Sequence, residues 1–195
     1  MDVSVLLEPE INLERLAEIL DGLGHEGRVH ATRTWSGKQK KALFEKAKGF
    51  KPVEIDFLVP SSVGNLVEVV HTGHNTTGIH PHFKKHFTRI EGEDFPIAGY
   101  NEQSLAMFSG PGYFAAYAGE GDRKGELVFD YDKITKTKPE SWPKIEKNDG
   151  FISGIVNGGM IDYVRALSTH VSVGEAYKNG KKRGFWFTLV RKDPN

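Results

Sequence analysis

The chain has 195 residues, of which 38% are hydrophobic and 27% are charged. This length and balance fit one folded domain spanning residues 1–195 and exclude an intrinsically disordered chain. The formal net charge is zero, so nucleic acid is an unlikely partner, and the absence of cysteine excludes disulfides, thiolate nucleophiles and cysteine-ligated zinc.

No apolar run approaches the roughly 20 residues that a membrane-spanning helix needs. The first residues, Met1 to Pro9, have neither the basic start nor the apolar stretch of a secretory signal peptide. We therefore expect a cytoplasmic protein without membrane attachment.

Two amphipathic helices are predicted near the N-terminus. From Asn12 to Leu23 leucine and isoleucine recur at helical spacing, with Asn12 as the N-cap. A second helix begins at Ser36, whose hydroxyl can form a capping box with Gln39, and ends at Gly49. Both helices are expected to cover a sheet.

The chain after Pro52 is rich in β-branched and aromatic residues. This composition predicts strands over Val53 to Val59, Leu66 to His71, Tyr113 to Ala118 and Glu126 to Tyr131. A helix is predicted from Ile152 to Leu167, although Gly158 and Gly159 weaken it by about 1 kcal/mol each.

The C-terminal region predicts a β-hairpin. His170 to Lys178 and Gly184 to Arg191 flank Asn179-Gly180, a pair that accepts the positive φ of a tight hairpin turn. Together the elements predict an α+β fold with an antiparallel, barrel-like sheet that is covered by the N-terminal helices and ends in a C-terminal β-hairpin.

Five of the eight histidines lie between positions 71 and 86. Neutral imidazole binds zinc, iron, nickel and copper, and a loop after a strand can bring several rings to one ion. The spacing matches no established metal motif, since there is no His-Glu-x-x-His. A divalent metal is therefore a hypothesis, with the candidate ligands His71, His74, His80, His82 and His86.

The second half of this segment also fits a helix. His82 and His86 are four residues apart and share a helical face, and Phe83 and Phe87 form a neighbouring apolar stripe. This spacing favours a surface helix with solvated histidines over a metal site.

A small-molecule pocket is the leading functional hypothesis. Strand alternation points His71 inward with Val67 and Val69, and the glycines near Tyr113 let a backbone approach a ligand. The candidate catalytic residues are His71, His170 and Tyr113. The candidate ligand-binding residues are Asn75, Tyr100, Asn101, Gly110 and Gly112.

Acidic residues provide weaker signals. Asp130 and Asp132 lie on one strand face with Tyr131 on the other, and they could hold a metal or act as a base. Asp162 and Arg165, three apart on the predicted helix, are read as a surface ion pair.

Three functions stay open at this point. The first is a protein that binds or transforms a small polar molecule in the pocket of His71, the Gly110–Phe114 loop and His170. The second is a metal-dependent enzyme that uses the histidine cluster. The third is a non-catalytic homo-oligomer with an aromatic interface. Spacing does not decide whether the chain is an enzyme.

Overall fold

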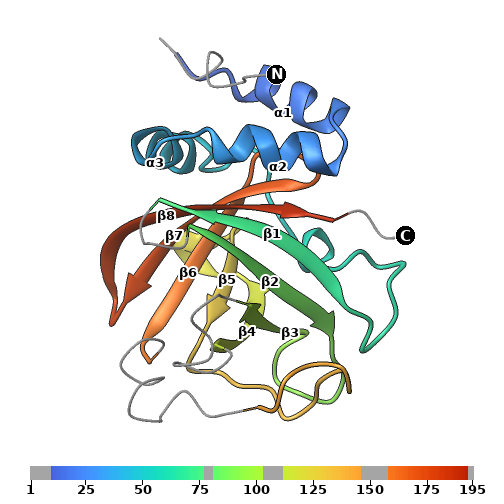
Figure 1. Ribbon diagram of the computed structural model, residues 1–195. Helices are drawn as coiled ribbons and strands as arrows, with labels where there is room; N and C mark the ends of the chain where they lie inside the picture. Colours follow the sequence, from blue (N-terminus) through green and yellow to red (C-terminus); the bar gives the residue numbers. More distant parts are fainter. Residues whose placement is uncertain (1–9, 77–80, 103–111, 146–157, 193–195) are drawn as a thin grey trace.

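The chain folds into a closed barrel of eight antiparallel strands with a layer of helices on one side (Figure 1). The computed structural model describes residues 10–76, 81–102, 112–145 and 158–192. Each strand pairs with its neighbours in the sequence, and β1 pairs with β8 to close the ring. The predicted α+β fold with a barrel-like sheet is therefore confirmed. The strands are β1 (Val69–Asn75), β2 (His82–Arg89), β3 (Ile97–Glu102), β4 (Gly112–Ala118), β5 (Leu127–Asp130), β6 (Met160–Ala166), β7 (Val171–Lys178) and β8 (Lys181–Arg191).

In the described residues three α-helices precede the barrel: α1 (Leu13–Gly22), α2 (His25–Arg33) and α3 (Gly37–Lys46). The Asn12 side chain accepts the N–H of Arg15, and Ser36 and Gln39 form the expected capping box of α3. Helix α3 packs on β7 and β8, and α2 packs on β8 and β1, while α1 lies on the outer side of both (Figure 1). The two predicted helices are confirmed, and α2 is an addition to them.

Alternation along each strand divides the barrel wall into an inner and an outer face. The inner face holds a core of aromatic and aliphatic residues, including Phe87, Phe114 and Phe129. The outer faces of β7 and β8 contribute Val171, Val173 and Val190 to a second core beneath the helices.

Three glycines make room for the interior rings. Gly73, Gly99 and Gly174 each pair directly with a phenylalanine on the adjacent strand. A Cβ on Gly99 would lie 2.5 Å from the ring of its partner Phe114 and 2.8 Å from the His86 carbonyl oxygen. Phenylalanine rings therefore occupy the space that side chains at these glycines would fill, in the manner of cross-strand aromatic rescue.

One end of the barrel is closed by the segment before β1. This segment contains the 3₁₀ helix η2 (Ile55–Phe57), whereas the sequence predicted a strand from Val53 to Val59. The strand prediction is wrong, because the segment crosses the barrel end instead of joining the sheet. Its apolar residues Val53, Leu58 and Val59 belong to the interior core.

Two helix predictions are also wrong. The described part of Ile152 to Leu167 is strand β6, which pairs with β5 and β7 over its length. Residues 152–157 lie outside the described part of the chain. The stretch from His82 to Phe87 belongs to β2, since its residues alternate between the two faces of the wall and pair with β1 and β3.

The other predicted strands are present in the structure, and the bounds of one of them differ clearly from those predicted. The strand expected from Leu66 begins at Val69 and continues to Asn75. The C-terminal hairpin is confirmed, with Asn179 and Gly180 both at positive φ.

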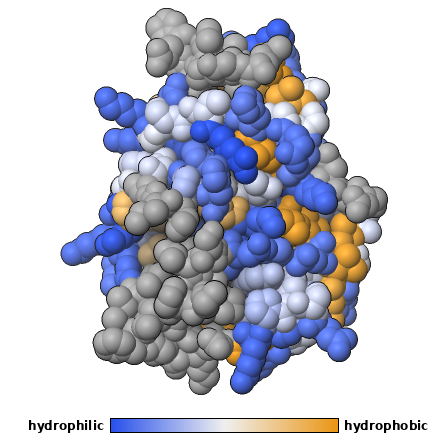
Figure 2. Space-filling view, in the orientation of Figure 1, coloured by the Kyte–Doolittle hydropathy of each residue, from blue (hydrophilic) through white to orange (hydrophobic). Residues whose placement is uncertain are grey.

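Hydrophilic residues make up most of the coloured surface in Figure 2, and the apolar residues on it gather mainly toward the right of the view. Within the described ranges, none of the helices combines the length and the apolar character needed to span a bilayer.

Candidate functional site in the barrel interior

A lysine lies inside the barrel. Lys85 of β2 faces inward between Phe83 and Phe87, because residues two apart on a strand share a face. Its side chain is only 2% exposed. A buried lysine is costly without partners, so its surroundings identify the first candidate site.

Three acceptors surround the Lys85 ammonium group. Nζ donates to Asn101 Oδ1 at 2.8 Å and to Asp162 Oδ2 at 3.3 Å, and it also donates to the Tyr131 hydroxyl. The three hydrogen bonds match the three N–H groups of an ammonium. Each N–H group of Lys85 therefore has a hydrogen-bond acceptor inside the barrel.

The acceptors come from three different parts of the barrel wall and also contact one another. Asn101 is near the end of β3, Asp162 lies in β6, and Tyr131 follows β5 directly. Asn101 Nδ2 donates to the Tyr131 hydroxyl at 2.9 Å, and this hydroxyl donates to Asp162 Oδ2 at 3.2 Å. We call these four residues the interior network.

Aromatic rings enclose the network. Lys85 Nζ lies 4.7 Å from the ring centre of Phe114, 5.1 Å from Tyr131 and 5.3 Å from Phe129. Phe83 and Phe187 add two more rings within 6 Å. Because the rings exclude water, they lower the local dielectric and strengthen every charge interaction in the network.

Burial moves the pKa values of Lys85 and Asp162 toward each other. It lowers the pKa of Lys85, although the neighbouring Asp162 carboxylate opposes this shift. Burial also raises the pKa of Asp162, against the effect of Lys85 and of Tyr131. The pKa of Tyr131 is raised well above its usual value by burial and by Asp162. Burial therefore disfavours the charged form of both Lys85 and Asp162, whereas their mutual attraction favours it.

His71, the main sequence candidate, lies at the closed end of the barrel. Its Nε2 is 2.9 Å from the Leu58 carbonyl oxygen of the crossing segment, and its Nδ1 is buried with no hydrogen-bond partner among the described residues. Burial first, then the positive charges of Arg191, His170 and His25, lower the pKa of His71 to about 3. The ring is therefore neutral and acts as a core hydrogen-bonding group.

His170 interacts with Arg191, and the charges of both residues act on His71. Arg191 Nη2 is 3.4 Å from His170 Nδ1, and Arg191 also donates to the Phe57 carbonyl oxygen. Tyr113, the third catalytic candidate, lies on the outer face of β4 instead. Its hydroxyl donates to the Pro143 carbonyl oxygen at 2.6 Å.

The predicted ligand-binding residues are divided between the two faces of the wall. Asn101 belongs to the interior network, whereas Tyr100 stacks on His86 outside the barrel with ring centres 4.5 Å apart. Asn75 ends β1, Gly112 begins β4, and Gly110 lies outside the described residues.

The described histidines of the 71–86 segment occupy three separate places. His71 is inside the barrel, His74 and His82 lie together outside it, and His86 is bound on both ring nitrogens by Glu68 and Glu102. His80 is not among the described residues. No group of three or more metal-ligating side chains occurs in the described ranges.

Two residues predicted to form a surface ion pair are buried on opposite faces of β6. Asp162 points into the barrel, whereas Arg165 points outward and donates to Glu126 Oε1 at 2.7 Å. The surface-pair prediction is wrong because the segment is a strand. The opposite orientation of Asp130 and Tyr131 is as expected, since Asp130 accepts from the Tyr117 hydroxyl outside the wall.

Sequence reasoning did not select Lys85 and Asp162. A strand interpretation of His-Phe-Lys-Lys-His-Phe would have placed Lys85 between two phenylalanines on one face, which is an unusual position for lysine. That pattern was the available signal, and the helix interpretation concealed it.

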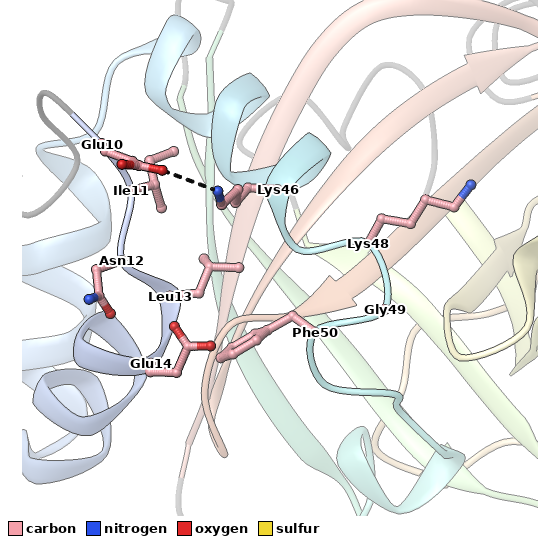
Figure 3. Close-up of a pocket in the computed structure, with 9 residues that line it drawn as sticks. All are labelled: Glu10, Ile11, Asn12, Leu13, Glu14, Lys46, Lys48, Gly49 and Phe50. Atoms are coloured by element: carbon pink, nitrogen blue, oxygen red, sulfur yellow. Dashed lines mark ion pairs between the residues drawn. The ribbon is translucent and has the colours of Figure 1, made fainter.

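A groove on the surface is a weaker candidate (Figure 3). It has a volume of about 610 Å³ and runs between the start of α1 and the end of α3, with Phe50 at one side. Its ion pair joins Lys46 to Glu10 at 3.8 Å, and these side chains are 53% and 86% exposed. Solvent screens such a pair, so the groove offers little to orient a ligand.

The fold and the site define an eight-stranded up-and-down barrel with a lysine-centred polar network in its core. Comparison with family models, curated proteins and solved structures finds no match to this chain. The functional argument therefore depends on the chemistry of the site.

Proposed function

We propose that the protein binds a small aldehyde or ketone inside its barrel and holds it as an imine on Lys85. The observation that supports this proposal is a fully buried lysine paired with a carboxyl group whose pKa moves toward its own. Eight-stranded barrels of this kind are large enough to accept one small ligand when interior side chains rearrange. The proposal keeps a small-molecule ligand, as in the sequence hypothesis, but limits its polar part to one carbonyl group and assigns the reacting group to Lys85.

The reaction begins with one proton transfer inside the pair. The Lys85 ammonium gives a proton to Asp162 across the 3.3 Å contact, which leaves a neutral amine and a carboxylic acid. An uncharged lysine is a nucleophile, whereas an ammonium is not.

The amine then attacks the carbonyl carbon of the ligand. The C–N bond forms as the carbonyl π bond breaks, and Asp162 delivers its proton to the resulting oxygen. Asp162 next takes a proton from the nitrogen and returns it to the hydroxyl group, which leaves as water. The product is a protonated imine beside the Asp162 carboxylate, so protons and charge balance.

The other network members have matching roles. Asn101 Nδ2 and the Tyr131 hydroxyl are hydrogen-bond donors beside the nitrogen, and they can polarise the carbonyl oxygen of the ligand. The surrounding rings favour a ligand with an apolar body and a single carbonyl group.

Reductive trapping tests the proposal. The protein is incubated with a panel of small aldehydes and ketones, the imine is reduced with cyanoborohydride, and the intact mass is measured. Wild type is expected to gain one adduct that Lys85→Arg lacks, because a guanidinium does not form an imine. Equal adduct formation by wild type and a folded Lys85→Arg variant would contradict the proposal.

A cytoplasmic location and a homo-oligomeric state remain proposals from the sequence. Light scattering after size-exclusion chromatography measures the second directly, through the mass of the protein in solution.

A further inference from the structure

A second buried lysine lies outside the barrel wall. Lys40 of α3 is 0% exposed, and its Nζ contacts His74 Nδ1 of β1 at 2.5 Å. The two residues join the helical layer to the outer face of the barrel. This location is separate from the interior network, because His74 and the inward-facing His71 lie on opposite faces of β1.

The surroundings of Lys40 are basic. The His74 and His82 rings are 5.2 Å apart, on directly paired residues of β1 and β2. Burial first, then the charges of Lys40, His82 and Arg33, lower the pKa of His74 to about 4. Every charge that acts on this ring is therefore positive.

These basic groups have no acidic partner in the described part of the chain. Neighbouring lysines of α3 do form ion pairs, Lys41 with Glu45 and Lys46 with Glu10. Among the described residues, neither Lys40 nor Arg33 is paired with a carboxylate.

Lys40 has fewer hydrogen-bond acceptors than Lys85 among the described residues. Lys85 has three acceptors for its three N–H groups, one of them a carboxylate. The described residues give Lys40 one acceptor, an uncharged imidazole nitrogen. A buried ammonium that lacks a counter-charge is costly, and an anion supplied from solution would remove that cost.

We propose that Lys40, His74 and His82 form a binding site for a small oxyanion of the phosphate class, at the seam between α3 and the outer face of β1 and β2. Lys40 donates the charge-assisted hydrogen bond, and the imidazoles supply additional donors. His82 is exposed and pairs directly with His74, so it is the member of the site that an anion in solution reaches first. Arg33 is exposed nearby and adds long-range attraction.

Titration with inorganic phosphate tests this site. Two-dimensional ¹H–¹⁵N spectra are recorded at constant ionic strength, with chloride replaced stepwise by phosphate. Saturating shifts are expected at the start of α3 and around His74. Lys40→Met is expected to weaken binding at least about tenfold, because a charge-assisted hydrogen bond is lost.

Two further variants complete the design. His82→Gln changes an exposed residue and so is expected to fold, and it is expected to weaken phosphate binding in the same direction. Lys38→Met removes the same charge from the solvent side of α3 and is expected to leave binding unchanged. The proposal is overturned if phosphate causes no saturating shifts, or if Lys40→Met and His82→Gln bind it as wild type does.

Discussion

The replacement of Lys85 by methionine tests the physics of the interior network. Methionine is unbranched, apolar and one atom shorter than lysine, so it keeps most of the packing among the five rings but leaves Asp162 without its charged partner. Lys85 and Asp162 are 2% and 6% exposed, so solvent screens the pair little. Removing one member of a buried pair costs about 3–5 kcal/mol when the other stays ionised.

The pH dependence separates this cost from simple loss of packing. Burial raises the pKa of Asp162 in the folded state, and the loss of Lys85 raises it further. A raised carboxyl pKa contributes stability that is present below the unfolded value and is lost as pH rises through the folded value. Lys85→Met should therefore be nearly as stable as wild type at about pH 4, and less stable at about pH 8 by roughly 1.4 kcal/mol per unit of pKa difference.

A double variant provides the control. Asp162→Asn in the Lys85→Met background removes the unpaired charge but keeps a group that can bond to Tyr131. We expect it to recover most of the lost stability, because uncharged replacements of buried pairs are often neutral or stabilising by about 1–4 kcal/mol. Urea unfolding followed by fluorescence of the buried Trp35 and Trp142 measures all three proteins. If Lys85→Met alone is as stable as wild type at about pH 8, the electrostatic argument is refuted.

Three further predictions concern the fold. Gly99→Ala should destabilise the barrel by about 1–3 kcal/mol, because its Cβ would contact Phe114 and a backbone oxygen. Gly22→Ala in α1 places its Cβ in open space, so it should be neutral or stabilising by up to about 1 kcal/mol. Urea midpoints compare the two, and equal effects would contradict the packing argument. Ser36→Ala should cost about 1 kcal/mol through loss of the α3 capping box, measured by thermal unfolding; an unchanged midpoint would count against the cap. Burial lowers the pKa of His71 to about 3, so its contribution to stability is lost as pH falls below about 6.5. His71→Gln should therefore reduce the decrease in unfolding free energy on acidification. The same pH dependence in wild type and variant would exclude His71 as the source of that decrease.

The parts of the fold that local chemistry specifies could be predicted. The caps at Asn12 and Ser36 begin their helices as expected, and Asn179-Gly180 forms the terminal hairpin. Helix α2 has few apolar residues and no side-chain cap, so its sequence carries little helical signal. Its stability comes from packing on β8 and β1, which no local pattern reports.

The errors have a common physical origin. His82 and His86 share a face both in a helix, where they are one turn apart, and in a strand, where they are separated by an even number of residues. Only pairing with β1 and β3 decides between the two. The segment around Ile55 has strand composition, yet it closes the barrel end because its apolar residues complete the interior core.

The site depends on contacts between distant residues. Lys85, Asn101 and Asp162 lie in separate strands and Tyr131 directly follows another, so closure of the barrel brings the four residues together. Asn101 was selected from the sequence, but as a loop residue beside a pocket. The side on which each residue faces follows from strand register, and register is a tertiary property.

The labelling of two adjacent lysines tests the central claim most directly. Lys84 and Lys85 are neighbours in β2, but Lys84 faces outward, is 50% exposed and is paired with Glu102. Peptide mapping after reductive trapping with one small aldehyde at neutral pH gives the adduct fraction at each residue. We predict that Lys85 carries more adduct than Lys84, because burial lowers the pKa of Lys85 and so favours its nucleophilic, uncharged form. Labelled Lys84 beside unlabelled Lys85 across the whole aldehyde panel would contradict the account.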